Sequence, residues 1–289
     1  MMTEVDIDHL KTWVGKSDTE EERSCVQPIH QYYGLLDRDD RPAEGDPMGP
    51  MCHYFFFKSK VNQSGIGPDG HPARGDFMPP VPLPRRMFAG AEIVYEKPLV
   101  IGETHTKTAT IEDVTMKEGS TGTLIFCKVR QDFFGEDGDL AVSETQNIVY
   151  RDDPPKDAND GKGGSGQGKS APDDHAYIRE ITPDPVMLYR YSSSTWNTHR
   201  IHYDRKYVTE VEGYPGLVVH GPLAASLLAE LALEENPGKT LKSFRFQARA
   251  PLFDTAPFKI AGKPTDQGAE LWSITPEGTV STLANATFE

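Results

Sequence analysis

The chain has 289 residues and a formal net charge of −14, from 44 acidic and 30 basic side chains. A charge of this sign disfavours a nucleic-acid-binding surface, although a local basic pocket for an anionic ligand is compatible with it. The three cysteines, at positions 25, 52 and 127, form no CxxC pair, so neither a disulfide framework nor a zinc knuckle is indicated. There is no signal-peptide pattern and no apolar run long enough to cross a bilayer. These features predict a cytoplasmic protein with no nucleic-acid partner and no membrane partner.

The first half of the chain is typical of two short helices followed by long strands. The helices are expected around residues 6–14 and 25–36. Strand-like alternation and β-branched residues then run between turns at Gly102, Gly119 and Asp137-Gly138. This pattern predicts a meander of long antiparallel strands. The four expected strands are residues 91–102, 104–119, 122–139 and 140–152.

A stretch rich in Pro, Gly, Ser and charge lies between Arg151 and His175 and has no apolar periodicity, which predicts a flexible linker. Residues 163–170 within it match the GxxxxGKS spacing of a phosphate-binding loop. Such a loop needs a buried strand before it and a helix after it. Here a Pro- and Asp-rich stretch precedes the match and Ala171-Pro172 follows it, so we interpret it as chance.

The length suits one large domain or two small ones, and the linker favours two. We therefore expect an N-terminal domain over residues 1–151, a linker over residues 152–175 and a C-terminal domain over residues 176–289.

The second half repeats the order of the first around a central helix. A helical or irregular segment is expected near residues 184–191, and the central helix from Pro222 to Glu235. Pro222 is tolerated at a first helical position, and Pro237-Gly238 ends the helix. Its continuous apolar face predicts a helix enclosed by a curved antiparallel sheet. The expected strands are residues 241–250, 258–263, 270–275 and 280–288.

The run from Tyr191 to Asp204 is polar and rich in histidine, and it comes shortly before this Gly-Pro-initiated helix. Unpaired backbone N–H groups at a helix N-terminus can hold the negative charge that develops on a thioester oxygen. The histidines could move the proton. Together, the run and the helix start predict acyl-thioester chemistry.

Two motifs in this region resemble those of the MaoC-like family of (R)-specific enoyl-CoA hydratases, which have the hot-dog fold. One is the family's polar run, with an Asp two residues before an Asn-Pro pair and five before a His. The other is a His-Gly pair followed by a Ser at the start of the central helix. The matching positions here are Asn197, His199, Arg200, His202 and Asp204 in the first motif, and His220, Gly221 and Ser226 in the second.

Residues 82–102 and 144–152 resemble the degenerate dehydratase domain that precedes this module in a double hot-dog branch. That branch includes mitochondrial-type 3-hydroxyacyl-thioester dehydratases and mesaconyl-C4-CoA hydratases. The resemblance implies an α+β double hot-dog, in which each half is a curved antiparallel sheet wrapped around a central helix. It also implies a single active site in the C-terminal half and a hydro-lyase that adds water reversibly to an enoyl-CoA. A branched C5 dicarboxylic acyl group, mesaconyl-C4-CoA or itaconyl-CoA, is the expected substrate.

A hydratase must deliver water to the β-carbon, supply a proton at the α-carbon and stabilise the enolate-like charge in between. His202 is expected to polarise the water. Asn197 stands where the family has an Asp, so it can orient the water but cannot exchange its proton. His199 positions Asn197 or the water, or braces the loop, and the sequence leaves these alternatives open.

The backbone N–H of Gly221 or Leu223 is the expected donor to the thioester oxygen, because Pro222 has none. Ser226 either shapes the acyl site or is a small packed residue, and the two readings are equally supported.

Arg85 and Arg86 are placed to pair with a substrate carboxylate, although an exposed bend is an equal alternative. Arg200 is a candidate for the phosphates of coenzyme A, which is part of the substrate. His199, His202 and Asp204 form a possible metal cluster, but it lacks the flanking pattern of a zinc motif. We therefore expect no metal and no redox cofactor.

Two other functions remain open at this stage. A hot-dog thioesterase would also place a helix N-terminus against a thioester carbonyl and activate water. A non-catalytic acyl-CoA-binding protein is made credible by Asn197 in the place of the acid. A homodimer is plausible but has no specific sequence signal.

Overall fold

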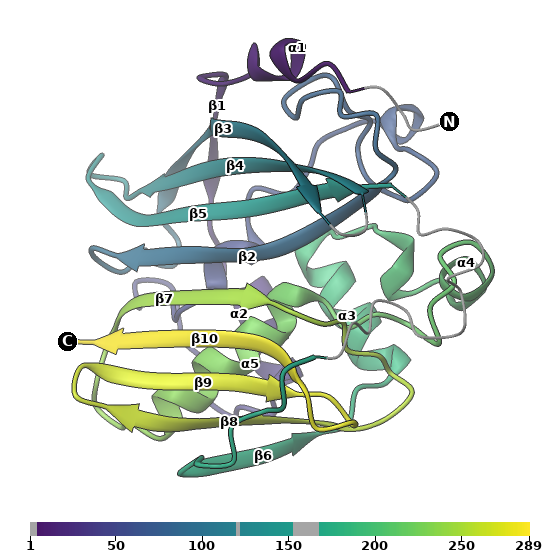
Figure 1. Cartoon of the computed structure of the whole chain (residues 1–289). Coiled ribbons are helices and arrows are strands. Elements are labelled where there is room, and N and C mark those ends of the chain that lie inside the picture. Colours follow the sequence, from purple (N-terminus) through teal and green to yellow (C-terminus); the bar gives the residue numbers. More distant parts are fainter. Residues whose placement is uncertain (1–4, 120–121, 153–167) are drawn as a thin grey trace.

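The computed structural model describes residues 5–119, 122–152 and 168–289, and one antiparallel sheet of ten strands runs through it (Figure 1). The N-terminal half contributes, in spatial order, β1 (Ser17–Arg23), β3 (Thr104–Gly119), β4 (Gly122–Phe134), β5 (Leu140–Arg151) and β2 (Arg85–Tyr95). The C-terminal half continues from β2 with β7 (Leu241–Ala248), β10 (Val280–Phe288), β9 (Gly268–Ile274), β8 (Phe258–Thr265) and β6 (Tyr177–Ile181).

The two halves of the sheet have the same topology. Each has an outer strand, then a meander of three sequential strands, then the strand that meets the other half. β2 and β7 pair across this junction, with Ile93 opposite Phe244 and Gly90 opposite Gln247. Gly90 has a φ of +142°, and a Cβ there would lie 2.2 Å from the Phe246 oxygen. Only glycine therefore allows the two halves to join this closely at this point.

Two helices occupy equivalent places in the chain order. α2 (Val26–Leu35) lies between β1 and β2, and α5 (Gly221–Glu234) lies between β6 and β7. α5 crosses the C-terminal half of the sheet and contacts β7 to β10 (Figure 1). The remaining helical elements are α1 (Ile7–Lys11), η1 (Cys52–Phe55), η2 (Gln63–Gly65), α3 (Pro185–Thr195), η4 (Arg200–His202) and α4 (Arg205–Glu210).

The larger hydrophobic core is shared by both halves. It combines the buried faces of α2 and α5 with inward side chains from the junction strands, such as Ile93 and Phe244. A second core lies within the N-terminal half, where Leu83 packs with Ile111, Ile125 and other strand residues. Because the large core crosses the junction, the halves stabilise one another.

The expected fold class, a double hot-dog of class α+β, is confirmed by this repeated helix-and-sheet architecture and by the solved structures described below. The helices expected at residues 25–36 and 222–235 are α2 and α5, and the strand expected at residues 104–119 is β3. One prediction was wrong in detail: only β3, β4 and β5 form the meander. β2 ends at Tyr95 and pairs with β5 and β7 instead of β3.

Two outer strands, β1 and β6, were not predicted. Every residue of the β1 sequence, SDTEEER, is charged or polar, as edge strands often are, so it has no apolar alternation that could indicate a strand.

The phosphate-loop match begins outside the described residues, but its end lies within them. Val280 N donates to Lys169 O (3.0 Å) and Ala171 N donates to Gly278 O (2.9 Å), so this end pairs with the β9–β10 turn. Within residues 168–176 no helix follows the match, which agrees with its interpretation as chance. The domain boundaries remain a prediction, because residues 153–167 are not described.

Candidate active site

The start of α5 provides the expected site for a developing oxyanion. His220 precedes the helix in an extended conformation and makes no side-chain cap, and Pro222 occupies the first turn. The segment before it is held by a hydrogen bond from Val219 N to Leu252 O (2.8 Å). The Phe88 ring of β2 lies 3.8 Å from the place where a Gly221 Cβ would be. The N-terminal half therefore reaches the helix start directly.

His202 lies beside this helix start. Its Nδ1 is 2.7 Å from Val218 O, so Nδ1 carries the proton and donates it, and Nε2 is left as an acceptor. The ring stacks on His220 with centroids 3.7 Å apart. Burial lowers the pKa of His202 to about 4, although the hydrogen bond to Val218 opposes the shift. His202 is therefore neutral near pH 7 and can accept a proton from water.

Asn197 and His199 form a local brace. Asn197 follows Trp196, whose left-handed conformation ends α3, and its Oδ1 accepts a hydrogen bond from His199 N (3.1 Å). The side chain of Asn197 thus holds the backbone of His199. The His199 ring meets His202 edge to face, at 5.5 Å between centroids. Burial, followed by the neighbouring His71 and His202, lowers the pKa of His199 to about 2.

His71 is a site residue that the sequence did not reveal. It comes from the N-terminal half, and its ring centroid is 4.1 Å from that of His199. Its Nδ1 is 3.1 Å from Asp69 Oδ2. The only local signal was a Gly-Pro-Asp-Gly-His turn within an irregular stretch, which has no periodicity and no motif spacing.

Four side chains in this region bury polar atoms that have no hydrogen-bond partner among the described residues. They are Tyr32, Tyr191, Ser226 and His220 at Nδ1. Burial raises the pKa of both tyrosines, and proximity to Ser226 partly offsets this, so the three hydroxyls lie close together. His220 uses its other nitrogen, Nε2, to bond Ser192 Oγ at 2.8 Å. Ser226 is therefore part of a buried polar patch one turn into α5.

The three arginines considered from the sequence have separate surroundings. Arg85 points to the segment after α4, where its guanidinium bonds Glu212 O at 3.0 Å and lies over the Tyr214 ring. Arg200 pairs with Asp204 at 2.8 Å and donates to Pro68 O at 3.0 Å. Arg86 lines a cavity on the N-terminal half.

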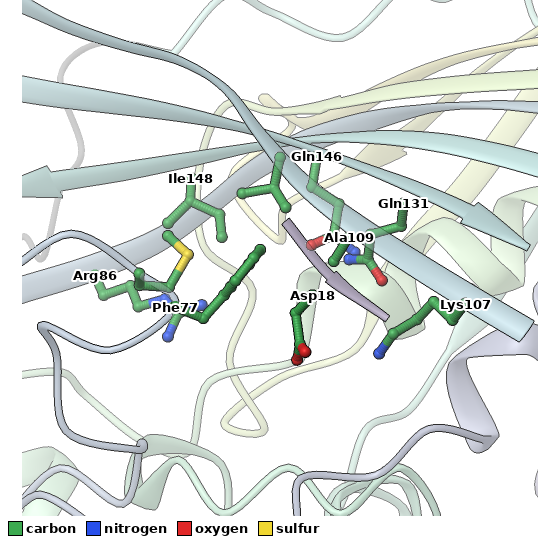
Figure 2. A pocket seen from close by; sticks show the side chains of 10 residues that line it. Asp18, Phe77, Arg86, Lys107, Ala109, Gln131, Gln146 and Ile148 are labelled. Carbon is green, nitrogen blue, oxygen red and sulfur yellow. The ribbon is translucent and has the colours of Figure 1, made fainter. Parts of the chain in front are cut away.

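The cavity is open space of about 220 Å³ on the face of the N-terminal sheet. Figure 2 shows Arg86 and Phe77 at one side, Lys107 and Gln131 at the other, and Asp18 of β1 between them. Arg86 also lowers the pKa values of His71 and His199 by its charge, so its guanidinium lies near these histidines as well as at the cavity.

Asp69, His71 and His199 bring their ligand-type atoms within 4.8 Å of one another, so they are near enough to share a cation. We do not assign a metal there, because Asp69 and His71 are bonded to each other. The cluster considered from the sequence is not assembled: His202 Nδ1 is bonded to Val218 O, and Asp204 is bonded to Arg200.

The fold and this arrangement define a hot-dog protein with a histidine site at the N-terminus of its central helix. A model of the family "Hydroxyacyl-thioester dehydratase type 2" matches residues 51–254. The chain belongs to this family, which confirms the family resemblance seen in the two motifs.

Two curated relatives agree with that family. The mesaconyl-C(4)-CoA hydratase of Chloroflexus aurantiacus is 39% identical over 279 residues, which are 96% of each chain. A mitochondrial hydroxyacyl-thioester dehydratase type 2 of Schizosaccharomyces pombe is 25% identical and covers 77% of this chain and 79% of its own length.

Solved structures with low sequence identity show the fold alone. A MaoC-like dehydratase from Phytophthora capsici has a TM-score of 0.69 at 15% identity, covering 99% of this chain and 98% of that one. A Mycobacterium tuberculosis protein described as having a double hot-dog fold has a TM-score of 0.56 at 10% identity, covering 96% of both chains. No helix in the described ranges combines the length and apolarity needed to span a membrane.

Proposed function

We propose that the protein hydrates an α,β-unsaturated acyl-CoA reversibly to a 3-hydroxyacyl-CoA. The observation that carries this proposal is His202, a buried imidazole with a lowered pKa that is stacked on the residue preceding α5. Its Nδ1 donates to Val218 O, and its Nε2 has no hydrogen-bond partner among the residues that the structure describes. A base and an oxyanion site next to each other are what addition of water to a thioester-conjugated double bond requires.

The residues divide the reaction between them. The thioester oxygen lies at the N-terminus of α5, where backbone N–H groups of Gly221 or Leu223 stabilise the enolate-like charge. Water attacks the β-carbon as His202 Nε2 takes its proton, and a proton then returns to the α-carbon. The sum is addition of one water molecule. Because this reaction is redox-neutral, it needs no redox cofactor, and coenzyme A enters only as part of the substrate.

We further propose a short dicarboxylic acyl group, with a branched C5 substrate as the best candidate. Arg86 and Phe88 are two residues apart on β2 and so share one face, about 6.6 Å apart along the strand. Phe88 is at the start of α5 and Arg86 lines the cavity. A thioester held at Gly221 thus directs a short acyl chain toward a guanidinium, and the name of the Chloroflexus relative, a mesaconyl-C(4)-CoA hydratase, supports the same class.

The roles of Asn197, His199 and Ser226 are also proposals: Asn197 and His199 order the loop that carries His202, and Ser226 borders the acyl site. A cytoplasmic location and a homodimer remain predictions.

The deciding experiment is turnover of crotonyl-, longer enoyl-, mesaconyl-C4- and itaconyl-CoA, with mass separation of hydrated thioester from free CoA. We expect hydrated product, with a dicarboxylic substrate preferred. Free CoA would instead identify a thioesterase, and binding of all four without product would identify an acyl-CoA-binding protein.

A further inference from the structure

A loop from the N-terminal half docks on the histidine run of the C-terminal half. Arg200 N donates to Asp69 O (2.9 Å), and Thr198 Oγ1 donates to Gly70 O (2.5 Å). Gly70 has a φ of +93°, and a Cβ there would lie 1.9 Å from Thr198 O, so only glycine allows this approach. The loop is also closed on itself by Gly67 N donating to His71 O (2.7 Å). The positions of its side chains relative to His199 are therefore fixed by backbone contacts.

Docking places a carboxylate and an imidazole in line with the buried histidines. Asp69 receives hydrogen bonds from His71 at Nδ1 (3.1 Å) and at the backbone N (3.0 Å). Nδ1 of His71 therefore carries the proton, and its Nε2 is an acceptor. The rings of His71, His199 and His202 then follow at 4.1 and 5.5 Å. His71 is partly exposed, whereas His199 and His202 are buried.

Asp69 is the acidic group whose charge raises the pKa values of His71 and His199. Burial alone would raise the pKa of Asp69, but its hydrogen bonds with His71 outweigh burial and hold the pKa well below its usual range. Burial lowers the pKa values of His71 and His199, and Asp69 opposes the shift at both. Arg86 acts in the opposite direction on both, and Arg74 does so on His71. Asp69 is thus ionised at neutral pH and favours positive charge on His71 and His199.

We propose that Asp69 is the carboxylate of the hydration site, a positioning residue that acts through His71 and replaces the acid missing at Asn197. The inference rests on the proposed function. When the water O–H bond breaks and the C–O bond forms at the β-carbon, the histidines hold one extra proton until it reaches the α-carbon. Asp69 stabilises this transient positive charge, as a carboxylate paired with a catalytic imidazole does. No net proton is gained or lost, and no further reactant is needed.

The test is Asp69→Asn, which keeps an acceptor for His71 but removes the charge. We expect kcat to fall roughly 10- to 100-fold with KM little changed, since the charge acts in the transition state. The acidic limb of the pH profile of kcat/KM should move to lower pH, because His71 and His199 lose the group that raises their pKa values. Asp76→Asn is the matched control, because Asp76 is on the same irregular segment and its side chain is 98% exposed. This variant should have the activity of the wild type.

His71→Gln separates a catalytic unit from a structural one. If Asp69 acts through His71, each single variant and the double variant should lose similar activity, because residues of one unit are not additive. The inference would be overturned if the activity losses of the two single variants multiplied in the double variant. It would also be overturned if Asp69→Asn lowered the rate without moving the acidic limb of the pH profile. Either result would leave Asp69 as a loop anchor. So would a rate that a chelator abolishes and Zn²⁺ restores, which would place a cation between these groups.

Different results contradict the proposed function and the role of Asp69. Wild-type protein that hydrates none of the four thioesters contradicts the proposed function itself. Wild-type protein that hydrates one of them at a rate that Asp69→Asn does not change contradicts only the role of Asp69.

Discussion

The N-terminal and C-terminal halves share one strand order but differ in where they carry extra chain. In the C-terminal half α3, η4 and α4 stand between the outer strand β6 and the helix α5. In the N-terminal half only Ser24 and Cys25 separate β1 from α2, so no equivalent of the His202 segment can exist there. Its extra chain instead follows the helix, between α2 and β2, and carries the Asp69–His71 loop.

This difference shows how a repeated fold can support one asymmetric site. The proposed base and oxyanion donors belong to the C-terminal half, because only in that half do helical segments and a loop stand between the outer strand and the central helix. The N-terminal half supplies Arg86, His71 and Asp69 from its junction strand and its loop. Each half is therefore expected to govern a different property: the C-terminal half the chemical step, and the N-terminal half the acyl group and the charge of the histidines.

The largest expected effect is on the chemistry of the C-terminal half. His202→Ala should lower kcat/KM for hydration roughly 10²- to 10⁴-fold, because it removes the proton acceptor. The matched control is His175→Ala, at an exposed position away from the site, which should keep wild-type kinetics. Steady-state kinetics on the preferred thioester measure both. Near-normal turnover of His202→Ala would shift the base to the Asp69–His71 side and break the division between the halves.

The two helices give the next comparison. Leu228 of α5 and Ile29 of α2 are fully buried in the shared core. Replacing either by Ala should lower the free energy of unfolding by about 2–5 kcal/mol. Because that core crosses the junction, denaturant unfolding should remain one transition in both variants.

The exposed Val211→Ala, at 66% exposure, should change stability by less than about 0.5 kcal/mol. Two separate transitions, with Ile29→Ala moving only one of them, would show that the halves are independent domains.

The third prediction concerns selectivity in the N-terminal half. Arg86→Met should raise KM for a dicarboxylic enoyl-CoA about 10- to 100-fold, which corresponds to loss of a charged hydrogen bond. Crotonyl-CoA, which has no distal carboxylate, should be little affected. Arg85→Met is the comparison, since Arg85 is directed to Glu212, and it should not discriminate between the two substrates. Equal effects of Arg86→Met on both substrates would remove the basis for a carboxylate pocket.

Much of this organisation could be predicted from the sequence, for reasons that differ between elements. The apolar face of α5 and the alternation of β3 are periodic, so their places were clear. β1 and β6 were not predicted, because outer strands need no continuous apolar face. The place of β2 in the sheet was not predicted either, because pairing between segments far apart in the sequence leaves no local pattern.

The candidate site also has a part that the sequence predicts and a part that it does not. His202, Gly221 and Ser226 belong to motifs with fixed spacing, and the structure brings them to one end of α5. The Asp69–His71 pair reaches the site through contacts between segments far apart in the chain, such as Thr198 with Gly70, which are 128 residues apart, and no spacing in the sequence encodes such contacts. Arg85 and Arg86 are adjacent in sequence, but successive side chains of a strand point to opposite faces of the sheet. The different surroundings of the two side chains therefore depend on the register of β2.

The smallest expected effect is a dependence of stability on pH that originates in the C-terminal histidines. Burial lowers the pKa of His202 from 6.5 to about 4, and the pKa values of His199 and His220 are lowered too. Between pH 6.5 and about 4 the unfolded chain therefore binds more protons than the folded one, so stability falls as pH falls. His202 alone should account for on the order of 1–2 kcal/mol between pH 7 and 5. The gap between the unfolding free energies at the two pH values should therefore narrow by this amount in His202→Gln and keep its wild-type size in His175→Gln. An unchanged gap in His202→Gln would show that His202 is not buried as a neutral imidazole.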